Sequence, residues 1–583
     1  MAAFNKYYEN ELSFLRELGR EFAAANPKLA GFLAAPGADP DVERLMEGVA
    51  FLTGRLREKL DDELPELTHE LLQILWPHYL RPSPSASILQ FTPLPNALNG
   101  LVRIRRGAEV DSLPVEGSAC RFRTCFDVDM LPLSVRGVAA KRVSGGSQVA
   151  VAFQLEPKAT LAALGEAPLR LYLGGGARES RTLYLWLRRY LKKIRIRWNN
   201  GGEERDLPIS RLQPAGFEPA EALLDYPAAS FAGYRVLQEY FTLPDKFLFL
   251  DLHGLGAREF SNINGGFEVQ FDFDHPLDED LRLGSETFQL FCTPIVNLFS
   301  RDADPVRLDH TKTEYRIRPA SADPAHYEIF SIDAVEGLAQ GSGARTAYHA
   351  FEAFQHGEEG GVFGAGAYYR TRKRPAIVGD GFETYASFIS MGDAPQREVI
   401  SLSLTCTNRN LPEKLKVGEI SVPTGSSPEI ATFRNVTKPT PSVTPPLDQG
   451  LHWLLISNLS LNYVSLLDVK TLRALLGAYD FRAFVNRTAR RESELRLEGL
   501  RRLSTEEADF LVRGRMVRGV RTVLEMQESQ FASEGEMFLF ASILAEFFAL
   551  YVSINSAHEL IVRGVDHGEE YRWPIKTGRK AVL

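Results

Sequence analysis

The sequence contains few residues of the kinds that form covalent cross-links. Only four cysteines occur among 583 residues, at Cys120, Cys125, Cys292 and Cys406, and none forms a CxxC pair. This usage argues against a disulfide framework and fits a reducing compartment. We therefore expect a cytoplasmic protein whose fold depends on buried apolar surface, which a chain of this length can supply without cross-links.

The motifs of common enzyme classes are also missing. The sequence has no GxxxxGK[ST], GxGxxG or GxSxG motif. No motif therefore supports a phosphate-binding loop, a dinucleotide-binding fold or the nucleophile turn of a hydrolase. Residues 69–73 (HELLQ) miss the zinc-protease pattern HExxH because glutamine, a poor zinc ligand, replaces the second histidine. We predict no catalytic residue, no cofactor and no metal site. A carbohydrate- or peptide-processing enzyme built on β domains is the alternative, which a pocket with two convergent carboxylates would support.

Long hydrophobic runs are scarce, and only one segment is long and apolar enough to be considered as a membrane-spanning helix. Residues 537–554 (MFLFASILAEFFALYVSI) are almost all apolar, but Glu546 lies near their centre. A carboxylate at the centre of a bilayer costs about 2.5–3.5 kcal/mol, so we predict a helix buried in a domain core or against a partner, and no membrane insertion. The first residues carry acids where a signal peptide has its apolar core, so we expect no export.

Length and periodicity predict a multidomain α+β protein. At about 150 residues per domain, the chain should hold three to five domains. We predict an N-terminal helical segment (1–85), a β-rich, sandwich-like domain (86–230), a second β-rich domain (231–435), a proline-rich linker (436–450) and an α+β C-terminal domain (451–583). Within the β-rich regions, residues 246–252 (KFLFLDL) predict a central strand and 267–273 (FEVQFDF) a strand with one wet face, whereas 338–365 read as a long exposed loop.

The C-terminal domain carries helix signals. Asp468 is placed to cap a helix over residues 468–476, another helix is expected over 451–459, and Ser504 with Glu507 has the spacing of a capping box, which predicts a helix over 504–511. Residues 515–525 and 560–563 are expected to be strands.

Three apolar stripes organise the N-terminal segment. The first recurs at helical spacing through Phe4, Tyr8, Leu12, Leu15, Leu18 and Phe22. The second helix begins at Asp39, a good N-cap followed by Pro40, and its stripe is close to a heptad seam, formed by Val42, Leu45, Val49, Leu52, Leu56 and Leu60. A third stripe follows at Leu67, Leu71 and Leu75. The stripes can cover one another as a small helical bundle, or part of the seam can stay exposed until a second chain binds it. Periodicity alone does not distinguish these two alternatives.

One segment has a concentrated positive charge. Residues 188–198 contain six arginines and lysines with Tyr190 and Trp198 among them. This composition is typical of a surface for nucleic acid or an acidic partner, and equally of a solvated strand face. The whole chain has 67 basic and 75 acidic residues, a net charge of −8, which argues against a global nucleic-acid binder.

Several strings carry a family resemblance. Residues 39–85 (DPDVERLMEGVAFLTGRLREKLDDELPELTHELLQILWPHYLRPSPS) resemble the opening signature of the TssF family, also called VasA or ImpG, of the type VI secretion system. Further strings resemble the same family in the same order, at residues 246–255, 292–319, 402–412, 453–466 and 547–556. Ala557-His558 departs from the expected pattern, in which an aromatic residue is commoner after the INS sequence. This single departure puts little of the family resemblance in doubt.

The resemblance implies a structural role and a set of partners. A TssF protein is expected to be a cytoplasmic baseplate subunit of a phage-like contractile injection system, docked near the inner-membrane complex. It is expected to bind TssG and a second TssF copy through helical segments, and to link the TssK adaptors to the VgrG hub and to the sheath and tube components. No nucleic acid is implied. The residues that we predict to bind partners combine the stripes with the apolar C-terminal helix: Phe4, Tyr8, Leu12, Leu15, Leu45, Val49, Leu52, Leu56, Leu60, Phe547, Phe548 and Tyr551.

Overall fold

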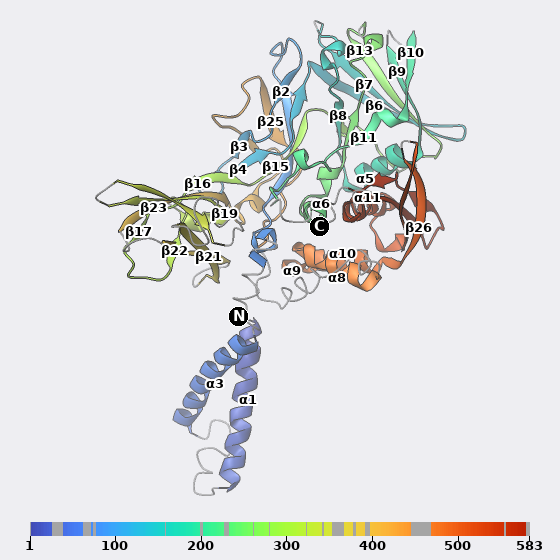
Figure 1. The fold of residues 1–583 in the computed structure, drawn as a ribbon. Coiled ribbons are helices and arrows are strands. Elements are labelled where there is room, and N and C mark those ends of the chain that lie inside the picture. Colours follow the sequence, from blue (N-terminus) through green and yellow to red (C-terminus); the bar gives the residue numbers. More distant parts are fainter. Residues whose placement is uncertain are drawn as a thin grey trace. The chain divides into compact units, whose positions relative to one another are not determined.

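The computed structural model folds into two compact units. The first comprises residues 1–74 with 446–460, and the second comprises 75–445 with 461–583. The structure describes residues 2–25, 39–61, 72–73, 77–157, 159–198, 202–226, 232–260, 262–278, 280–321, 323–340, 343–351, 366–376, 381–390, 397–444, 468–512, 514–552 and 556–578. The α+β class predicted from the sequence is confirmed, with helices at the N-terminus and many β-sheets (Figure 1).

The first unit is built on two long helices, α1 (Ala2–Ala25) and α3 (Pro40–Asp61), which pack side by side (Figure 1). The expected start of α3 is confirmed. A side-chain oxygen of Asp39 accepts hydrogen bonds from the backbone N–H of Asp41 at 2.9 Å and of Val42 at 3.4 Å. This cap satisfies donors that have no partner within the helix.

The predicted boundary between two successive β domains at residues 230 and 231 is wrong, because strands from both segments share sheets. The six-stranded sheet places β1 between β15 and β25, with Ala86 opposite Val296 and Leu89 opposite Asn435. Hydrophobic alternation marks where strands occur but not which strands pair. The strand order in this sheet is β24 (Ile420–Pro423), β3 (Glu109–Ser112), β4 (Arg121–Thr124), β15 (Cys292–Val296), β1 (Ala86–Pro93) and β25 (Ala431–Asn435).

Two smaller sheets mix the same segments. One has the order β10 (Glu203–Leu207), β9 (Leu191–Trp198), β13 (Gly266–Phe273), β7 (Gly146–Leu155) and β6 (Leu133–Val143). The other has the order β11 (Leu212–Pro214), β12 (Phe249–Leu252), β8 (Leu169–Leu173) and β14 (Phe288–Gln289). A two-stranded ribbon pairs β2 (Val102–Ile104) with β5 (Val128–Met130).

The largest sheet contains part of the segment expected to be an exposed loop. Its order is β16 (Phe299–Asp302), β23 (Glu398–Thr407), β19 (Glu328–Ala339), β20 (Arg345–Ala350), β21 (Ala367–Pro375), β22 (Phe382–Ser390) and β18 (Tyr315–Ile317), and β17 (Val306–Leu308) also pairs with β23. Within 338–365 the prediction is therefore wrong at β20, which pairs with β19 on one side and β21 on the other. Small and polar residues are tolerated there because pairing with two neighbours holds the strand. Residues 352–365 lie outside the described part.

The proline-rich segment is not a free linker over its described part. The backbone of Val443 exchanges two hydrogen bonds with that of Ser83, at 2.8 and 2.9 Å, and the N–H of Thr440 donates to the carbonyl of Ala86 at 2.8 Å. The extended geometry that proline imposes suits a segment lying along a strand as well as it suits a linker. Residues 445–450 lie outside the described part.

The two strands predicted from short motifs are present. β13 (FEVQFDF) is central in its sheet, so Gln270 on its expected wet face is buried. β12 is an inner strand with every residue buried, although Lys246 and Phe247, the first two residues of KFLFLDL, belong to a 3₁₀ turn (Pro244–Phe247).

The C-terminal sheet corrects one helix prediction. Residues 504–511 belong to the long strand β26 (Leu500–Val512), where Ser504 faces Val523 of β27 (Arg515–Met526). A capping box is a local signal, and here pairing along the full length of β27 outweighs it. β28 (Ala557–Gly564), β29 (Glu570–Arg572) and β30 (Lys576–Thr577) complete the sheet, and the strands predicted at 515–525 and 560–563 are confirmed.

Helices pack on this framework. α8 (Val469–Tyr479) begins as predicted, since Asp468 accepts a hydrogen bond from the N–H of Thr471 at 3.2 Å. The helix expected over 451–459 lies outside the described residues. The remaining helices of the second unit are α5 (Ala177–Leu185), which continues into a π-helical turn at Trp186–Tyr190, α6 (Ala232–Thr242), α9 (Arg482–Val485), α10 (Arg487–Glu498) and α11 (Glu534–Tyr551).

The apolar segment predicted to be a buried helix is α11. It packs against α5, α6 and β28 (Figure 1). Glu546, the acidic residue within its apolar run, forms an ion pair with Lys576 of β30. None of the helices in the described residues is long and apolar enough to cross a membrane.

A fully buried charge cluster ties α6 to the loops beside it. One oxygen of Glu239 accepts from Lys246 Nζ at 2.5 Å and from Arg235 Nη1 at 3.0 Å. The other accepts from the backbone N–H of Leu223 at 2.7 Å and of Leu224 at 3.3 Å. Burial lowers the pKa of Lys246, and the carboxylate of Glu239 opposes that shift. The charged side chains of this cluster stabilise one another, because removing one of them would leave a buried charge without its counter-charge.

A buried histidine makes stability depend on pH. Burial lowers the pKa of His558 to about 4, from an ordinary value near 6.5, and its Nε2 lies 2.9 Å from Thr522 Oγ1. The unfolded chain therefore binds more protons between about pH 6.5 and pH 4, so stability is full above this window and falls as the pH falls through it. We expect the wild type to lose about 2 kcal/mol more of unfolding free energy between pH 7.5 and pH 5 than His558→Gln, in urea titrations. Equal losses in the two proteins would contradict this assignment.

Candidate partner-binding surface

The inner faces of α1 and α3 pack against each other. Leu12 and Ala50 are buried, and Tyr8 and Leu15 are half-buried on the same side of α1 as Leu12. Arg16 Nε donates to Glu43 Oε1 at 2.9 Å, which adds an ion pair at the edge of this contact. Tyr8, Leu12 and Leu15, which we predicted as partner-binding residues, thus lie in or beside the contact between the two helices.

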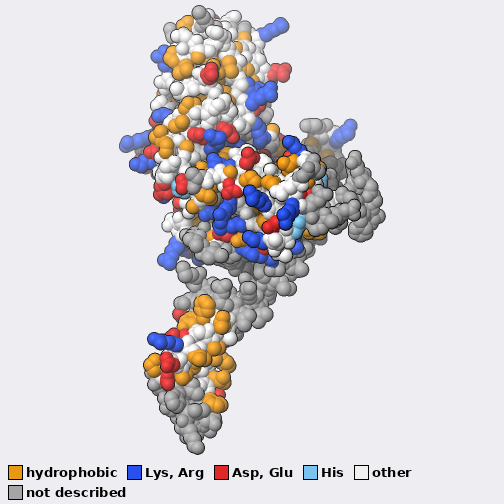
Figure 2. Space-filling model, turned by 90° about the vertical axis from the view of Figure 1, so that its left-hand side faces the viewer, with side chains coloured by type: hydrophobic (Ala, Val, Ile, Leu, Met, Phe, Trp, Pro, Cys, Tyr) orange, Lys and Arg blue, Asp and Glu red, His pale blue; other side chains and the backbone are white. Residues whose placement is uncertain are grey.

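The seam of α3 faces away from this contact. Leu45 is 70% exposed, Leu52 is 64% exposed and Val49 is 38% exposed, at spacings of four and three residues. These three residues, which we call the α3 seam, are the predicted heptad positions, and Phe51 beside them is also exposed. Hydrophobic side chains run along the helical unit in Figure 2. An apolar stripe of this kind on a folded helix is typical of a surface that a second helix covers.

A second exposed stripe lies on α1, and the sequence-based grouping missed its first member. Phe14, Leu18 and Phe22 follow one another at intervals of four residues, and all three are about half exposed. We had placed Leu18 and Phe22 on the stripe of Leu12, but Leu12 points into the helix pair. The interval of four between Phe14 and Leu18 was the signal that could have separated the two faces. The side chains of Phe4, Leu56, Leu60 and Tyr551 lie outside the described part.

Two of the predicted partner-binding residues are core residues of this chain. Phe547 and Phe548 are fully buried. The ring of Phe547 lies 6.0 Å from that of Tyr234 in α6, and the ring of Phe548 lies 5.7 Å from that of His558 in β28. A helix that is apolar on all sides can be buried by its own chain or by a partner, and here its own chain buries it. We therefore remove both residues from the partner-binding set.

The lysines and arginines of β9 in the basic segment at 188–198 are paired with acidic residues of the same chain. Lys193 Nζ lies 2.8 Å from Asp206 Oδ2, Lys192 Nζ lies 2.8 Å from Asp274 Oδ2, and Arg197 Nε lies 3.2 Å from Glu204 Oε2. Most of these acids come from β10, which pairs with the basic strand β9. Cross-strand pairs of opposite charge match a solvated sheet face, so this segment does not offer a row of free cations for nucleic acid.

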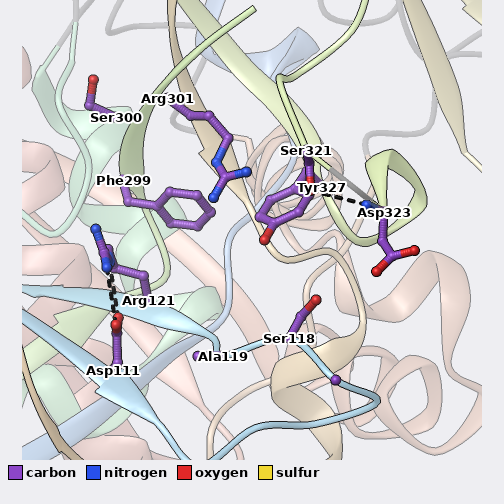
Figure 3. Close-up of a pocket in the computed structure, with 11 residues that line it drawn as sticks. Asp111, Ser118, Ala119, Arg121, Phe299, Ser300, Arg301, Ser321, Asp323 and Tyr327 are labelled. Carbon is purple, nitrogen blue, oxygen red and sulfur yellow. Dashed lines mark hydrogen bonds and ion pairs between the residues drawn. The ribbon is translucent and has the colours of Figure 1, made fainter.

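A polar cleft of about 370 Å³ is the place where the enzyme alternative can be tested. It lies between the six-stranded sheet and β16, and two carboxylates line it, Asp111 and Asp323 (Figure 3). Asp111 is held by Arg121, whose Nε and Nη2 donate to its two oxygens at 2.9 and 3.0 Å. With one carboxylate engaged in this way, the cleft does not offer the pair of free carboxyl groups that acid–base hydrolysis needs.

The cysteines offer no nucleophile. All four thiols are free and buried, and burial raises the pKa of Cys120, Cys125 and Cys406 to about 12. A thiol with so high a pKa stays protonated at neutral pH. In the described part of the chain, no group of three or more His, Cys, Asp or Glu side chains is arranged to hold a metal ion.

Comparison with known proteins identifies the family. The family model described as "Type VI secretion system, TssF" matches residues 1–580. The chain is 33% identical, over 633 aligned positions that cover 99% of each protein, to the type VI secretion system component TssF1 of Pseudomonas aeruginosa. A chain of the cryo-electron microscopy structure of the type VI TssK-TssF-TssG baseplate subcomplex matches 92% of this chain and 100% of its own length, with 29% identity and a TM-score of 0.77. A chain of the type VI baseplate complex matches 99% of this chain and 100% of its own length, with 27% identity and a TM-score of 0.66. This chain belongs to the TssF family of type VI secretion system baseplate components.

Proposed function

We propose that this protein is a non-enzymatic, structural subunit of a cytoplasmic baseplate wedge, which binds the TssG protein of its own secretion system through the α3 seam. The observation that carries the proposal is the exposure of Leu45, Val49 and Leu52 on a helix that is already packed on its other side. Leaving such side chains in water forgoes about 1.5–3 kcal/mol for each one that could be buried. A helix of TssG would recover that free energy.

The second stripe supports a second contact. Phe14, Leu18 and Phe22 lie on α1, so a helical unit with two exposed stripes can meet two neighbours. We propose that the second neighbour is another copy of this chain in the same wedge. The likeness to a chain of the TssK-TssF-TssG subcomplex supports TssK as a further partner. A link from the wedge to the VgrG hub and to the sheath is proposed from the family resemblance.

Co-expression tests the proposal. The full chain, affinity-tagged, is produced together with the TssG and TssK of the same gene cluster, and the eluate is analysed by size-exclusion chromatography with light scattering. We expect one complex whose mass accounts for two copies of this chain with one TssG, with TssK retained on it. Elution of this chain alone, with TssG in the flow-through, would contradict the proposal. A complex with a single copy would remove only the second contact.

A further inference from the structure

The polar cleft contains a guanidinium that is held in place without a counter-charge. Arg301 Nη1 donates to the carbonyl of Ala320 at 2.8 Å, and the guanidinium lies over the ring of Tyr327, 4.2 Å from the ring centroid (Figure 3). Among the described residues, no carboxylate lies within ion-pair distance of Arg301, and none accepts a hydrogen bond from its Nε or Nη2. These two nitrogens form the edge of a guanidinium that binds a carboxylate through two parallel hydrogen bonds.

A carboxylate in the same cleft also has no counter-charge. Asp323 lines the cleft and directly precedes a 3₁₀ turn (Pro324–His326), but its side chain does not cap that turn. Among the described residues, no cation lies within ion-pair distance of this carboxylate. The backbone around it is held, because the N–H of Asp323 lies 3.2 Å from Ser321 Oγ, and His326 Nδ1 lies 2.9 Å from Ser118 Oγ on the opposite wall. The carboxylate is therefore exposed to solvent on a fixed turn.

The other charged side chains that line the cleft neutralise each other. Arg121 Nε and Nη2 donate to the two oxygens of Asp111 at 2.9 and 3.0 Å, and Arg121 Nη1 donates to Glu109 at 3.3 Å. One cation, Arg301, and one anion, Asp323, remain. A ligand that carries one negative and one positive group would pair with both, whereas a simple anion or a simple cation would leave one of them without a partner.

The size and walls of the cleft suit a small molecule. Its volume of about 370 Å³ is within the range of small-ligand sites. The rings of Phe299 and Tyr327, whose centroids lie 6.0 Å apart, give it an apolar wall beside the charged groups. In the view of Figure 3, Arg301 and Asp323 lie on either side of Tyr327. An α-amino acid has a carboxylate, an ammonium group and a side chain on one carbon, which matches these three features.

We propose that this cleft binds a free α-amino acid, with its carboxylate on Arg301, its ammonium group on Asp323 and its side chain against the aromatic wall. The hairpin formed by β3 and β4 supplies one side of the cleft, and β16 with the residues that follow it supplies the other. A bound amino acid would therefore lie between two sheets of the second unit. The site is separate in sequence and chemistry from the α3 seam, and it stands or falls independently of the proposed TssG contact.

Three matched small molecules test the inference. L-leucine carries both charges, isocaproate has the same skeleton without the ammonium group, and isoamylamine has it without the carboxylate. Each is titrated into the full chain, and its dissociation constant is measured by saturation-transfer difference NMR. We expect L-leucine to bind about threefold more tightly than isocaproate and at least about tenfold more tightly than isoamylamine. The first ratio is smaller because Asp323 is exposed to solvent, whereas Arg301 offers two parallel donors.

Substitution of each charge identifies the group of the ligand that it binds. Arg301→Met keeps the apolar stem over Tyr327 and should weaken L-leucine and isocaproate by at least about tenfold while isoamylamine binds as before. Asp323→Asn should bind L-leucine and isocaproate with equal affinity, because the ammonium group no longer meets a carboxylate.

Matched substitutions outside the cleft serve as controls. Arg307 and Asp304 are exposed residues that do not line the cleft, so Arg307→Met and Asp304→Asn should bind the three molecules as the wild type does. Thermal unfolding curves of all four variants should match the wild type. Equal binding of the three molecules, tighter binding of isocaproate than of L-leucine, or no binding of L-leucine would overturn the proposal. Unchanged binding in Arg301→Met or in Asp323→Asn would overturn it as well.

Discussion

Leu45→Asp and Leu52→Asp are each expected to weaken co-purification with TssG by at least about 30-fold without unfolding the chain. Both side chains are largely exposed, so a polar replacement leaves no cavity and buries no charge in the protein alone. In the complex, each variant would place a carboxylate in an apolar seam, and the loss of one central anchor already costs about 2 kcal/mol or more. Pull-down with tagged TssG, followed by titration of the purified proteins, measures the effect.

Two further variants control for changes in the helix itself. Arg44→Asp introduces the same side chain next to Leu45 at a position whose side chain is 81% exposed, and it should leave TssG binding unchanged. Phe14→Asp alters the stripe on α1 and should reduce the number of copies of this chain in the complex while TssG stays bound. If Leu45→Asp and Leu52→Asp retain TssG as the wild type does, the α3 seam is not the TssG contact.

Glu239→Ala is expected to be the most destabilising single change in the second unit, at about 3–5 kcal/mol. The carboxylate is fully buried and neutralises Lys246 and Arg235 while it accepts two backbone N–H groups. Its removal leaves two buried cations without a counter-charge and two donors without an acceptor. Urea unfolding followed by circular dichroism, with intrinsic fluorescence as a second probe, measures the loss.

A double variant shows whether the charge, rather than the volume, is responsible. Glu239→Gln with Lys246→Met removes the carboxylate together with its ammonium partner, so it should be less destabilised than Glu239→Gln alone. A surface pair is the matched comparison. Arg103 donates to Asp129 through two hydrogen bonds, at 2.6 and 2.8 Å, but the side chain of Arg103 is about half exposed, so Asp129→Asn should cost no more than about 1 kcal/mol. A loss in Glu239→Ala as small as in Asp129→Asn would contradict the role of the cluster.

Some elements were predictable because their signals are local. The start of α3 at Asp39, the start of α8 at Asp468 and the apolar helix α11 follow from capping residues and periodicity within one segment. The α3 seam was predictable for the same reason, since positions 45, 49 and 52 share one helix face whatever surrounds them. The strand β26 was not, because a capping signal at Ser504 competed with a partner strand that the local pattern does not reveal.

The sequence by itself determined the helical seam and the apolar C-terminal helix, because these depend on residue type and on spacing along one segment. Only the tertiary structure decided that β1 lies between β15 and β25, that acids of β10 neutralise the basic strand β9, and that the chain itself covers Phe547 and Phe548. These outcomes depend on contacts between residues far apart in the chain. A hydrophobic pattern states that a face must be covered, and it does not state which distant residues cover it.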